Sequence, residues 1–259
     1  MPRTVAAQRY VTPLREGGSL PALVEADDDG LYVVKFRGAG QGPRVLVAEW
    51  LAGELARAAG LRVPELVFVD VDPALGDSEP DIEIHDLVQR SGGLNVGLDF
   101  LPGALSFSPA AAPVVDAAFA ADTVWVDGLL TNPDRTVANP NMLVWHRNIW
   151  LIDHGAALYV HHAWREPDAH ARQPFERLRD HVLLPFAGSI LEADERLGGT
   201  IRADLINDLV TVIPDLWLPP DSIIGDADRQ RDAYRRYLAL RLTPPRPFVE
   251  EAERARRRA

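Results

Sequence analysis

Five side chains in this sequence have the types and the order along the chain that phosphoryl transfer needs. They are Lys35, Glu49, Asp134, Asn139 and Asp153. An ammonium group can hold the phosphates of a nucleotide, and a carboxylate together with a carboxamide can bind Mg²⁺. A further carboxylate can accept the proton of an attacking hydroxyl group. Whether these groups meet depends on the elements that carry them.

Lys35 is the only lysine in a chain that contains 27 lysines and arginines together. It lies in the apolar stretch LYVVKF, residues 31–36, which the turn sequence DDDG at 27–30 separates from an earlier apolar stretch. This pattern predicts a β-hairpin in which Tyr32 and Phe36 share one face of the second strand and Lys35 lies on the other. A compact ammonium group suits a phosphate, and arginine is not an equivalent substitute.

The following stretch, residues 44–60, has the periodicity of an α-helix. Glu49 lies on its small apolar stripe, whereas Glu54 has Arg57 three positions on and is expected on an exposed, ion-paired face. A carboxylate among apolar residues needs a cation to offset the cost of its desolvation, and Lys35 is the candidate one element upstream. A strand lysine paired with a glutamate on the next helix holds the nucleotide phosphates in protein kinases.

The other candidates lie after a helical run at about 112–131. Asp134 precedes Asn139 by five positions, which is the spacing within the D-x-x-x-x-N catalytic loop of kinases. Two short apolar stretches then predict a hairpin over 142–153, and the sequence Asp-His-Gly begins at its end, at Asp153. The hairpin would return the chain so that Asp153 and Asn139 bind Mg²⁺ while Asp134 faces a substrate hydroxyl group.

With these motifs in order, the chain resembles the HipA-like kinase family, a bacterial branch of the protein-kinase-like fold. The resemblance rests on VVKF, EWLAGELARAAGL, DRTVAN and LIDHG, and it covers roughly residues 15–160. It implies an α+β fold of two lobes: a small N-lobe with an antiparallel sheet plus one helix, and a larger, mostly helical C-lobe. We place the N-lobe at residues 1–98, a hinge at 99–105 and the C-lobe at 106–259.

The resemblance also implies what each candidate residue does, with ATP and Mg²⁺ as cofactors. Lys35 would bind phosphate, and Glu49 would orient it. Asp134 would be the catalytic base. Asn139 and Asp153 would bind the metal.

Two glycine-rich stretches compete as the loop that covers the nucleotide phosphates. The first consists of Gly17, Gly18 and Ser19 and comes before the hairpin, where such a loop is expected. The second, GAGQGP at 38–43, follows the lysine strand, which is the wrong place for a kinase nucleotide loop, so we favour the first. The expected hinge lies within 97–104, where main-chain groups near Phe100 and Leu101 would meet adenine.

Some features leave alternatives open. Asn141 rivals Asn139 as a metal ligand, because an apolar run follows it directly, although the five-residue spacing favours Asn139. His154 stands where kinases carry the phenylalanine of D-F-G, and D-R-x-x-x-N with D-H-G is also similar to the lipid-kinase branch. About 15 residues precede Gly17, so we expect a short form that lacks the additional N-terminal subdomain of HipA toxins.

Composition argues against several other classes of protein. The formal net charge of −11 disfavours nucleic-acid binding, the absence of cysteine excludes thiolate chemistry, and no apolar run is long enough for a membrane helix.

From the motifs, the resemblance and the composition together, we expect a cytoplasmic, ATP- and Mg²⁺-dependent phosphotransferase that acts on a protein serine or threonine. The alternatives are a small-molecule or lipid kinase of the same fold, and a pseudokinase that binds ATP or serves as a scaffold without turnover.

Overall fold

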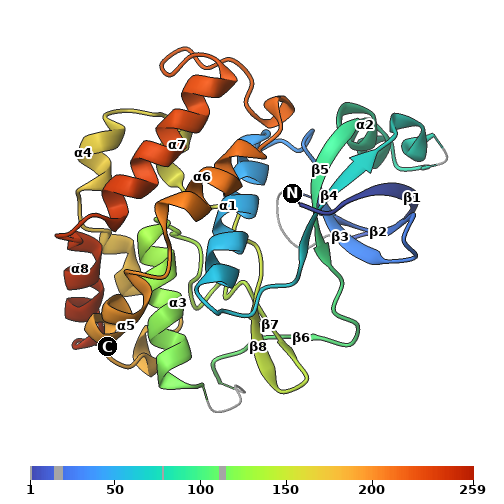
Figure 1. Ribbon diagram of the computed structural model, residues 1–259. Coiled ribbons are helices and arrows are strands. Elements are labelled where there is room, and N and C mark those ends of the chain that lie inside the picture. Colours follow the sequence, from blue (N-terminus) through green and yellow to red (C-terminus); the bar gives the residue numbers. More distant parts are fainter. Residues whose placement is uncertain (1, 15–19, 78, 111–114) are drawn as a thin grey trace.

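The computed structural model of this protein describes residues 2–14, 20–77, 79–110 and 115–259. Figure 1 shows a mixed α+β molecule with a group of strands on one side and a group of helices on the other. Helix α1 (Arg44–Ala58) lies between the two groups (Figure 1). Helix α1 is therefore the element through which strands and helices are brought together.

Five strands close into a barrel in the order β1-β2-β3-β5-β4. They are β1 (Thr4–Pro13), β2 (Ala22–Ala26), β3 (Leu31–Lys35), β4 (Leu66–Val71) and β5 (Gly93–Asp99). The neighbouring strands are antiparallel except for β1 and β4, which run parallel and close the barrel. The expectation of an antiparallel sheet is wrong for this pair, because the hairpin and α1 between them supply the long crossover that a parallel pair needs.

The β2–β3 hairpin forms as the sequence predicts. Asp29 in its turn adopts a left-handed conformation with a φ of 61°, which aspartate tolerates better than most residues. Tyr32, Val34 and Phe36 are buried in the interior of the barrel. Because side chains alternate along a strand, Lys35 points out of the barrel, and it meets α1 there.

Trp50 connects helix α1 to the elements on both sides of it. The Trp50 ring packs edge-on against Phe68 of β4, with 4.9 Å between the ring centroids. The Trp50 indole N–H donates to the Leu209 carbonyl oxygen of α6 (Ala203–Thr211) over 3.0 Å. The position of α1, and of any side chain on it, is therefore fixed by the barrel and by the C-terminal helices together.

A second helix, α2 (Ile82–Arg90), packs on the barrel after the short 3₁₀ helix η1 (Pro73–Gly76) (Figure 1). Its residues Ile84, Leu87 and Val88 complete the apolar core of the barrel. The expectation of a single helix in the N-terminal part is therefore wrong. The i, i+3, i+4 spacing of these three residues is the signal that was missed.

The second half of the chain begins with a small antiparallel sheet and continues as helices. The sheet consists of β6 (Leu105–Ser106), β7 (Met142–Trp145) and β8 (Asn148–Leu151). The further α-helices are α3 (Ala117–Leu129), α4 (Pro167–Ala171), α5 (Ile190–Leu197), α7 (Ala227–Leu242) and α8 (Pro247–Arg256). Short 3₁₀ helices lie between them: η2 (Tyr159–His162), η3 (Glu176–Asp180), η4 (Leu184–Phe186) and η5 (Asp215–Trp217). In the part of the chain that the structure describes, no helix has the length and apolar character needed to cross a bilayer.

Candidate active site

The structure places Lys35 and Glu49 in contact as a buried ion pair. Lys35 Nζ lies 2.9 Å from Glu49 Oε2, and the two residues are 5% and 0% exposed. Lys35 Nζ also donates to Asp153 Oδ1. One ammonium group therefore joins a carboxylate of α1 to a carboxylate that follows β8.

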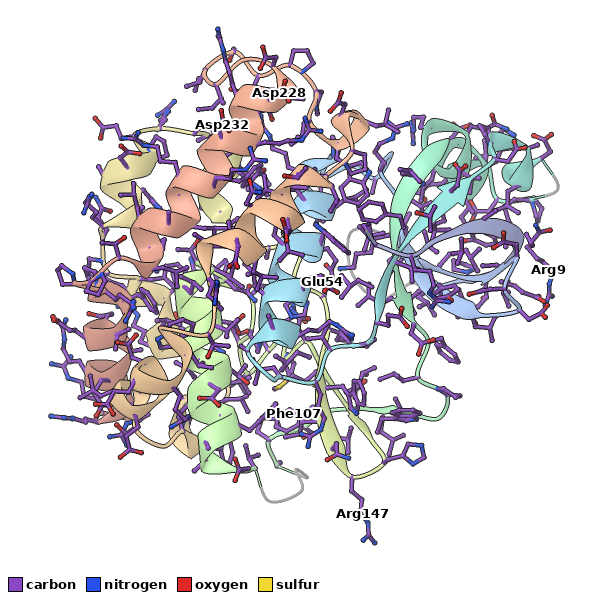
Figure 2. The ribbon with its side chains drawn as sticks, viewed as in Figure 1. Arg9, Glu54, Phe107, Arg147, Asp228 and Asp232 are labelled. Atoms are coloured by element: carbon purple, nitrogen blue, oxygen red, sulfur yellow. The ribbon has the colours of Figure 1, made fainter. Side chains whose placement is uncertain are left out.

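The charges in this cluster keep one another ionised. Burial opposes the charge of Lys35, but Glu49 and Asp153 outweigh that effect and raise the pKa of Lys35 above its ordinary value. Burial alone would raise the pKa of Glu49, yet the charge of Lys35 lowers it well below its ordinary range. Glu54 of the same helix (Figure 2) has no lysine beside it and pairs with Arg57 over 3.4 Å. Burial raises the pKa of Glu54, because the charge of Arg57 offsets the effect of burial only in part.

The Asp-His-Gly segment approaches α1 closely after the end of β8. Asp153 has a left-handed φ of 54°, a conformation that costs energy in a residue other than glycine and that is often kept at functional sites. A Cβ atom on Gly155 would lie 2.7 Å from Cγ1 of Val45 in α1, so the segment needs a glycine at this position. This close approach lets the Asp153 carboxylate reach Lys35.

His154 is buried beside the same glutamate. Its Nδ1 atom lies 3.7 Å from Glu49 Oε1, which is longer than a hydrogen bond. Within the described residues, neither ring nitrogen of His154 has a hydrogen-bond partner, and Glu49 Oε1 has none either. His154 therefore approaches the carboxylate oxygen that Lys35 leaves free.

Asp134 lies in the loop between α3 and β7, where two asparagines hold its carboxylate. Asn139 Nδ2 and Asn141 Nδ2 donate to Asp134 Oδ2 over 2.8 and 3.1 Å. Asn139 is exposed, whereas Asn141 is buried and has a left-handed φ of 49°. Of the two rival metal ligands, Asn139 is therefore the one whose side chain is accessible to a ligand.

A buried cluster that the sequence analysis missed supports this loop. Asp127 of α3 accepts hydrogen bonds from Arg135 Nε (2.6 Å), Asn132 Nδ2 (2.9 Å) and His181 Nε2 (3.0 Å). Arg135 Nη1 in turn donates to the Asn141 carbonyl oxygen over 2.5 Å. The charge of Arg135 overcomes the effect of burial and lowers the pKa of Asp127 well below its usual range. An aspartate inside the apolar stretch AADTVWVDGLL was the available signal, by the same reasoning that singled out Glu49.

A cavity of about 370 Å³ lies beside the loop and the Asp-His-Gly segment. Asp134, Asn139 and Asp153 line it, together with Tyr159 from η2. Gln41, from the turn between β3 and α1, lines it as well. The cavity is large enough for part of a substrate, and it gives a hydroxyl group access to the Asp134 carboxylate.

A family model of HipA-like kinases matches residues 8–240 of the sequence. This chain belongs to the HipA-like kinase family. The solved structure of the Helicobacter pylori proinflammatory kinase CtkA is similar to this HipA-like kinase, with a TM-score of 0.59 and 14% identity over 96% of this chain and 97% of that one. At that identity the likeness shows a kinase-like fold and nothing more. No protein with a curated function matches the sequence.

The oxygen donors of this HipA-like kinase fit Mg²⁺ at one edge of the cavity. The Asp153 side chain is 44% exposed, and Lys35 contacts one of its two carboxylate oxygens. Asn139 supplies a carboxamide oxygen beside the same cavity. In the described part of the chain no group of three or more His, Cys, Asp or Glu side chains could hold a metal by itself. The donors therefore suit a cation that takes its remaining ligands from nucleotide phosphates and water.

Of the two candidate phosphate loops of the HipA-like kinase, the structure describes only the second. Gly17, Gly18 and Ser19 lie outside the described residues. The stretch 38–43, which the sequence analysis set aside, adjoins the cavity through Gln41. The Gly38 backbone N–H donates to Ser91 Oγ over 3.0 Å, so this turn is also attached to the end of α2.

The predicted hinge residues offer one free acceptor and one free donor. The Phe100 N–H donates to the Leu31 carbonyl oxygen over 2.9 Å, and the Leu101 carbonyl oxygen accepts from the Ala104 N–H over 3.2 Å. The Phe100 carbonyl oxygen and the Leu101 N–H make no hydrogen bond within the described residues. Because these two groups belong to one trans peptide bond, they point in opposite directions, and an adenine edge can engage only one of them.

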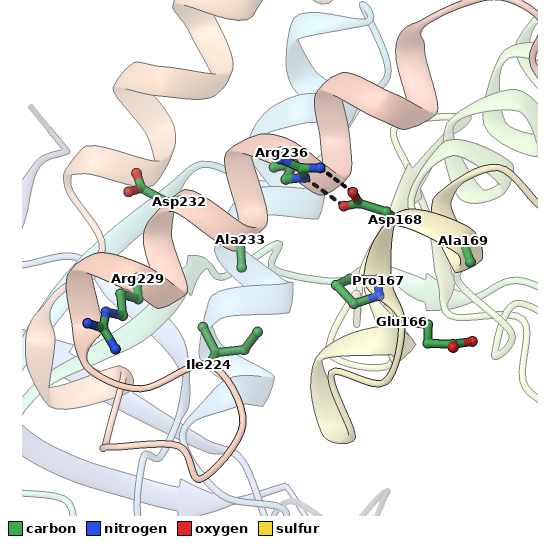
Figure 3. Close-up of a pocket in the computed structure, with 9 residues that line it drawn as sticks. All are labelled: Glu166, Pro167, Asp168, Ala169, Ile224, Arg229, Asp232, Ala233 and Arg236. Carbon is green, nitrogen blue, oxygen red and sulfur yellow. Dashed lines mark hydrogen bonds and ion pairs between the residues drawn. The ribbon is translucent and has the colours of Figure 1, made fainter.

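A larger cavity, about 630 Å³, lies between α4 and α7 (Figure 3). Arg236 of α7 reaches across to Asp168 of α4, and the Nε atom of the arginine lies 2.7 Å from Oδ1 (Figure 3). None of the five candidate residues lines this cavity. Size alone therefore does not identify the active site.

Proposed function

We propose that this HipA-like kinase transfers the γ-phosphoryl group of ATP, with Mg²⁺, to a serine or threonine hydroxyl group of a protein. The observation that carries the proposal is the buried contact of Lys35 with Glu49 and Asp153, beside a cavity that Asp134 lines. A buried lysine–glutamate pair has no structural need to be there, because two apolar side chains would fill the same space without the desolvation cost.

In this proposal, residues 1–98 are the N-lobe, 99–105 the hinge and 106–259 the C-lobe. ATP lies between the lobes with its adenine edge at main-chain groups near Phe100 and Leu101. The Phe100 carbonyl oxygen and the Leu101 N–H are not engaged by other described residues, so either of them is available to adenine. Gly17, Gly18 and Ser19 would cover the phosphates.

Each catalytic candidate has a distinct role. Lys35 donates to phosphate oxygens, and Glu49 keeps its ammonium group in place. Asp153 and Asn139 would hold Mg²⁺, which neutralises charge on the phosphates. Asp134 accepts the proton of the acceptor hydroxyl group. The hydroxyl oxygen then forms a bond to the γ-phosphorus, while the bond from that phosphorus to the leaving oxygen of ADP breaks.

The surroundings of Asp134 favour a polypeptide acceptor over a sugar or another small polar alcohol. Val137, in the same loop, is 69% exposed, and Tyr159 at the cavity is 62% exposed. Solvent-exposed apolar and aromatic side chains near the proposed base provide contact area for the residues that flank a serine or threonine in a polypeptide substrate.

The test is phosphoryl transfer from γ-labelled ATP with Mg²⁺, to the protein itself and to a cell lysate. Wild type is compared with Asp134→Ala, Asp153→Ala and, as a control, the surface variant Asp204→Ala. We expect labelled protein bands with wild type and the control, and none with the other two variants. Label found only in lipids or small molecules would identify the alternative kinase class. ATP binding without transfer would identify a pseudokinase.

A further inference from the structure

The cavity at Asp134 contains a cationic side chain that the proposed mechanism does not use. Arg177, from the 3₁₀ helix η3, lines this cavity with Asp134, Asn139 and Asp153. It is exposed, and within the described residues no carboxylate lies close enough to form an ion pair with it. The neighbouring Arg179, in contrast, lies 3.9 Å from Asp180.

The geometry of η3 explains why Arg177 faces the cavity. With three residues per turn, consecutive side chains of a 3₁₀ helix point in different directions. Leu178 is buried in the core and anchors the turn. Arg179 points to a different groove, which it lines with Arg258 near the C-terminus. Arg177 is thereby left on the side of the catalytic loop.

The position of Arg177 relative to Asp134 is fixed by hydrogen bonds. The Val182 N–H, just after η3, donates to the Arg135 carbonyl oxygen over 3.0 Å, and His181 forms a β-bridge with Thr136. The segment that carries Arg177 is therefore attached to the loop that carries Asp134. An acceptor that enters the cavity would meet both side chains at once.

The other groups that line the cavity do not neutralise Arg177. Lys35 already holds Asp153, and two amides already hold Asp134. His162 also lines the cavity, but burial and the charge of Arg44 lower its pKa, which disfavours its charged form. Among the described residues that line the cavity, Arg177 is consequently the cation that is available to a ligand.

We propose that Arg177 binds a carboxylate of the acceptor, so that the preferred substrates are protein segments with an aspartate or glutamate next to the phosphorylated serine or threonine. The planar guanidinium group matches a carboxylate with two parallel hydrogen bonds. This inference rests on the proposed protein kinase activity and adds its substrate class. The net charge of the protein is −11, so a preference for acidic peptides cannot arise from general attraction and requires a local cation.

The test uses the full chain, ATP and Mg²⁺, with three serine peptides that differ only in the residues next to the serine: glutamate, glutamine or lysine. The readout is the ratio of kcat/KM between peptides, measured in competition. For wild type we expect the glutamate peptide to exceed the glutamine peptide by about tenfold or more, the ordinary size of a hydrogen bond to a charged group. Arg177→Glu should remove this preference and favour the lysine peptide, whereas Arg177→Lys should keep part of it.

Arg179→Glu is the matched control, because it makes the same charge change two residues away on the same turn. It should leave the ratio between peptides as in wild type. Equal use of the three peptides by wild type, or the same ratio in Arg177→Glu as in wild type, would overturn the acidic preference while leaving the kinase function intact. Absence of transfer to any peptide, to the protein itself and to lysate proteins would overturn the proposed function, and this inference with it.

Discussion

Lys35 Nζ lies 2.9 Å from Glu49 Oε2 in a place that solvent barely reaches. Lys35→Met would leave the Glu49 carboxylate buried without its cation, which should lower the free energy of unfolding by about 3–5 kcal/mol. The double variant Lys35→Met/Glu49→Leu should recover more than half of that loss, because neither charge remains buried. Phosphoryl transfer should not return with it, since the group that we propose binds phosphate is gone. Denaturant unfolding and the transfer assay measure the two effects.

Glu54→Gln in the same helix is the control for this pair. Glu54 and Arg57 are partly exposed, and such pairs contribute at most about 1 kcal/mol. A Lys35→Met variant as stable as wild type would show that the buried pair has no stabilising role.

The pKa of Asp127 leads to a prediction about acid stability. Arg135 holds this pKa below the ordinary value of 3.8, so the stabilising contribution of the carboxylate is complete above pH 3.8 and is lost as the pH falls through the lower, folded-state value. At pH 7, Asp127→Asn should cost about 3–5 kcal/mol, because it leaves the Arg135 guanidinium group buried without a counter-charge. The cost should shrink at a pH low enough to protonate the wild-type carboxylate.

Asp122→Asn in the same helix tests whether the effect belongs to Asp127. Asp122 pairs with the half-exposed Arg196, and burial raises rather than lowers the pKa of Asp122. Its substitution should cost at most about 1 kcal/mol. Unfolding curves of equal midpoint for the two variants at pH 7 would contradict the supporting role of the Asp127 cluster.

The parts of the fold and of the site that could be predicted are those that a short stretch of sequence specifies by itself. The β2–β3 hairpin has a turn sequence between two apolar stretches, and Lys35 stands out by its type. Asp134 and Asn139 lie five positions apart in one loop, so their contact needs no knowledge of the rest of the chain. The helix at 82–90 was missed, although its three buried apolar residues follow the helical period.

The parts that could not be predicted depend on contacts between distant segments. Asp127 and His181 are 54 residues apart and meet only because the segment after η3 returns to the loop that carries Asp134. The parallel pairing of β1 with β4 likewise needs the closed barrel. The stretch 38–43 was rejected as the nucleotide loop because it follows the lysine strand. The fold nevertheless brings Gln41 of this stretch to the cavity. No single stretch of sequence contains these relationships.

The position of α1 depends on an ion pair with the C-terminal part of the chain. Arg44, at the start of α1, donates to Asp221 Oδ2, while Oδ1 of the same carboxylate accepts the Ile223 and Ile224 N–H groups over 2.8 and 2.9 Å. We expect Asp221→Asn to loosen the first turn of α1, which faster amide hydrogen exchange there would show. Transfer activity should fall because Glu49 lies on the same helix. Asp215 pairs with Arg231, and its own side chain is 79% exposed, so Asp215→Asn should change neither exchange nor transfer. Unchanged exchange in Asp221→Asn would contradict the prediction.

Gly155 offers the sharpest test of how closely the Asp-His-Gly segment must approach α1. A Cβ atom there would lie 2.7 Å from Val45 Cγ1 and 3.5 Å from Glu49 Oε2. Gly155→Ala should therefore force the two segments apart, cost about 1–3 kcal/mol of stability and reduce phosphoryl transfer. Gly40→Ala is the control, because a Cβ atom on Gly40 would meet nothing within 4 Å.

The steric cause of the Gly155 effect can be separated from a change in backbone flexibility. Val45→Ala removes the methyl group that the new Cβ atom would strike. If the clash is the cause, Gly155→Ala/Val45→Ala should recover stability and transfer relative to Gly155→Ala, even though Val45→Ala alone is destabilising. If the free-energy changes of the two single variants simply add in the double variant, the clash is not the cause. The glycine would then be needed for its backbone freedom instead.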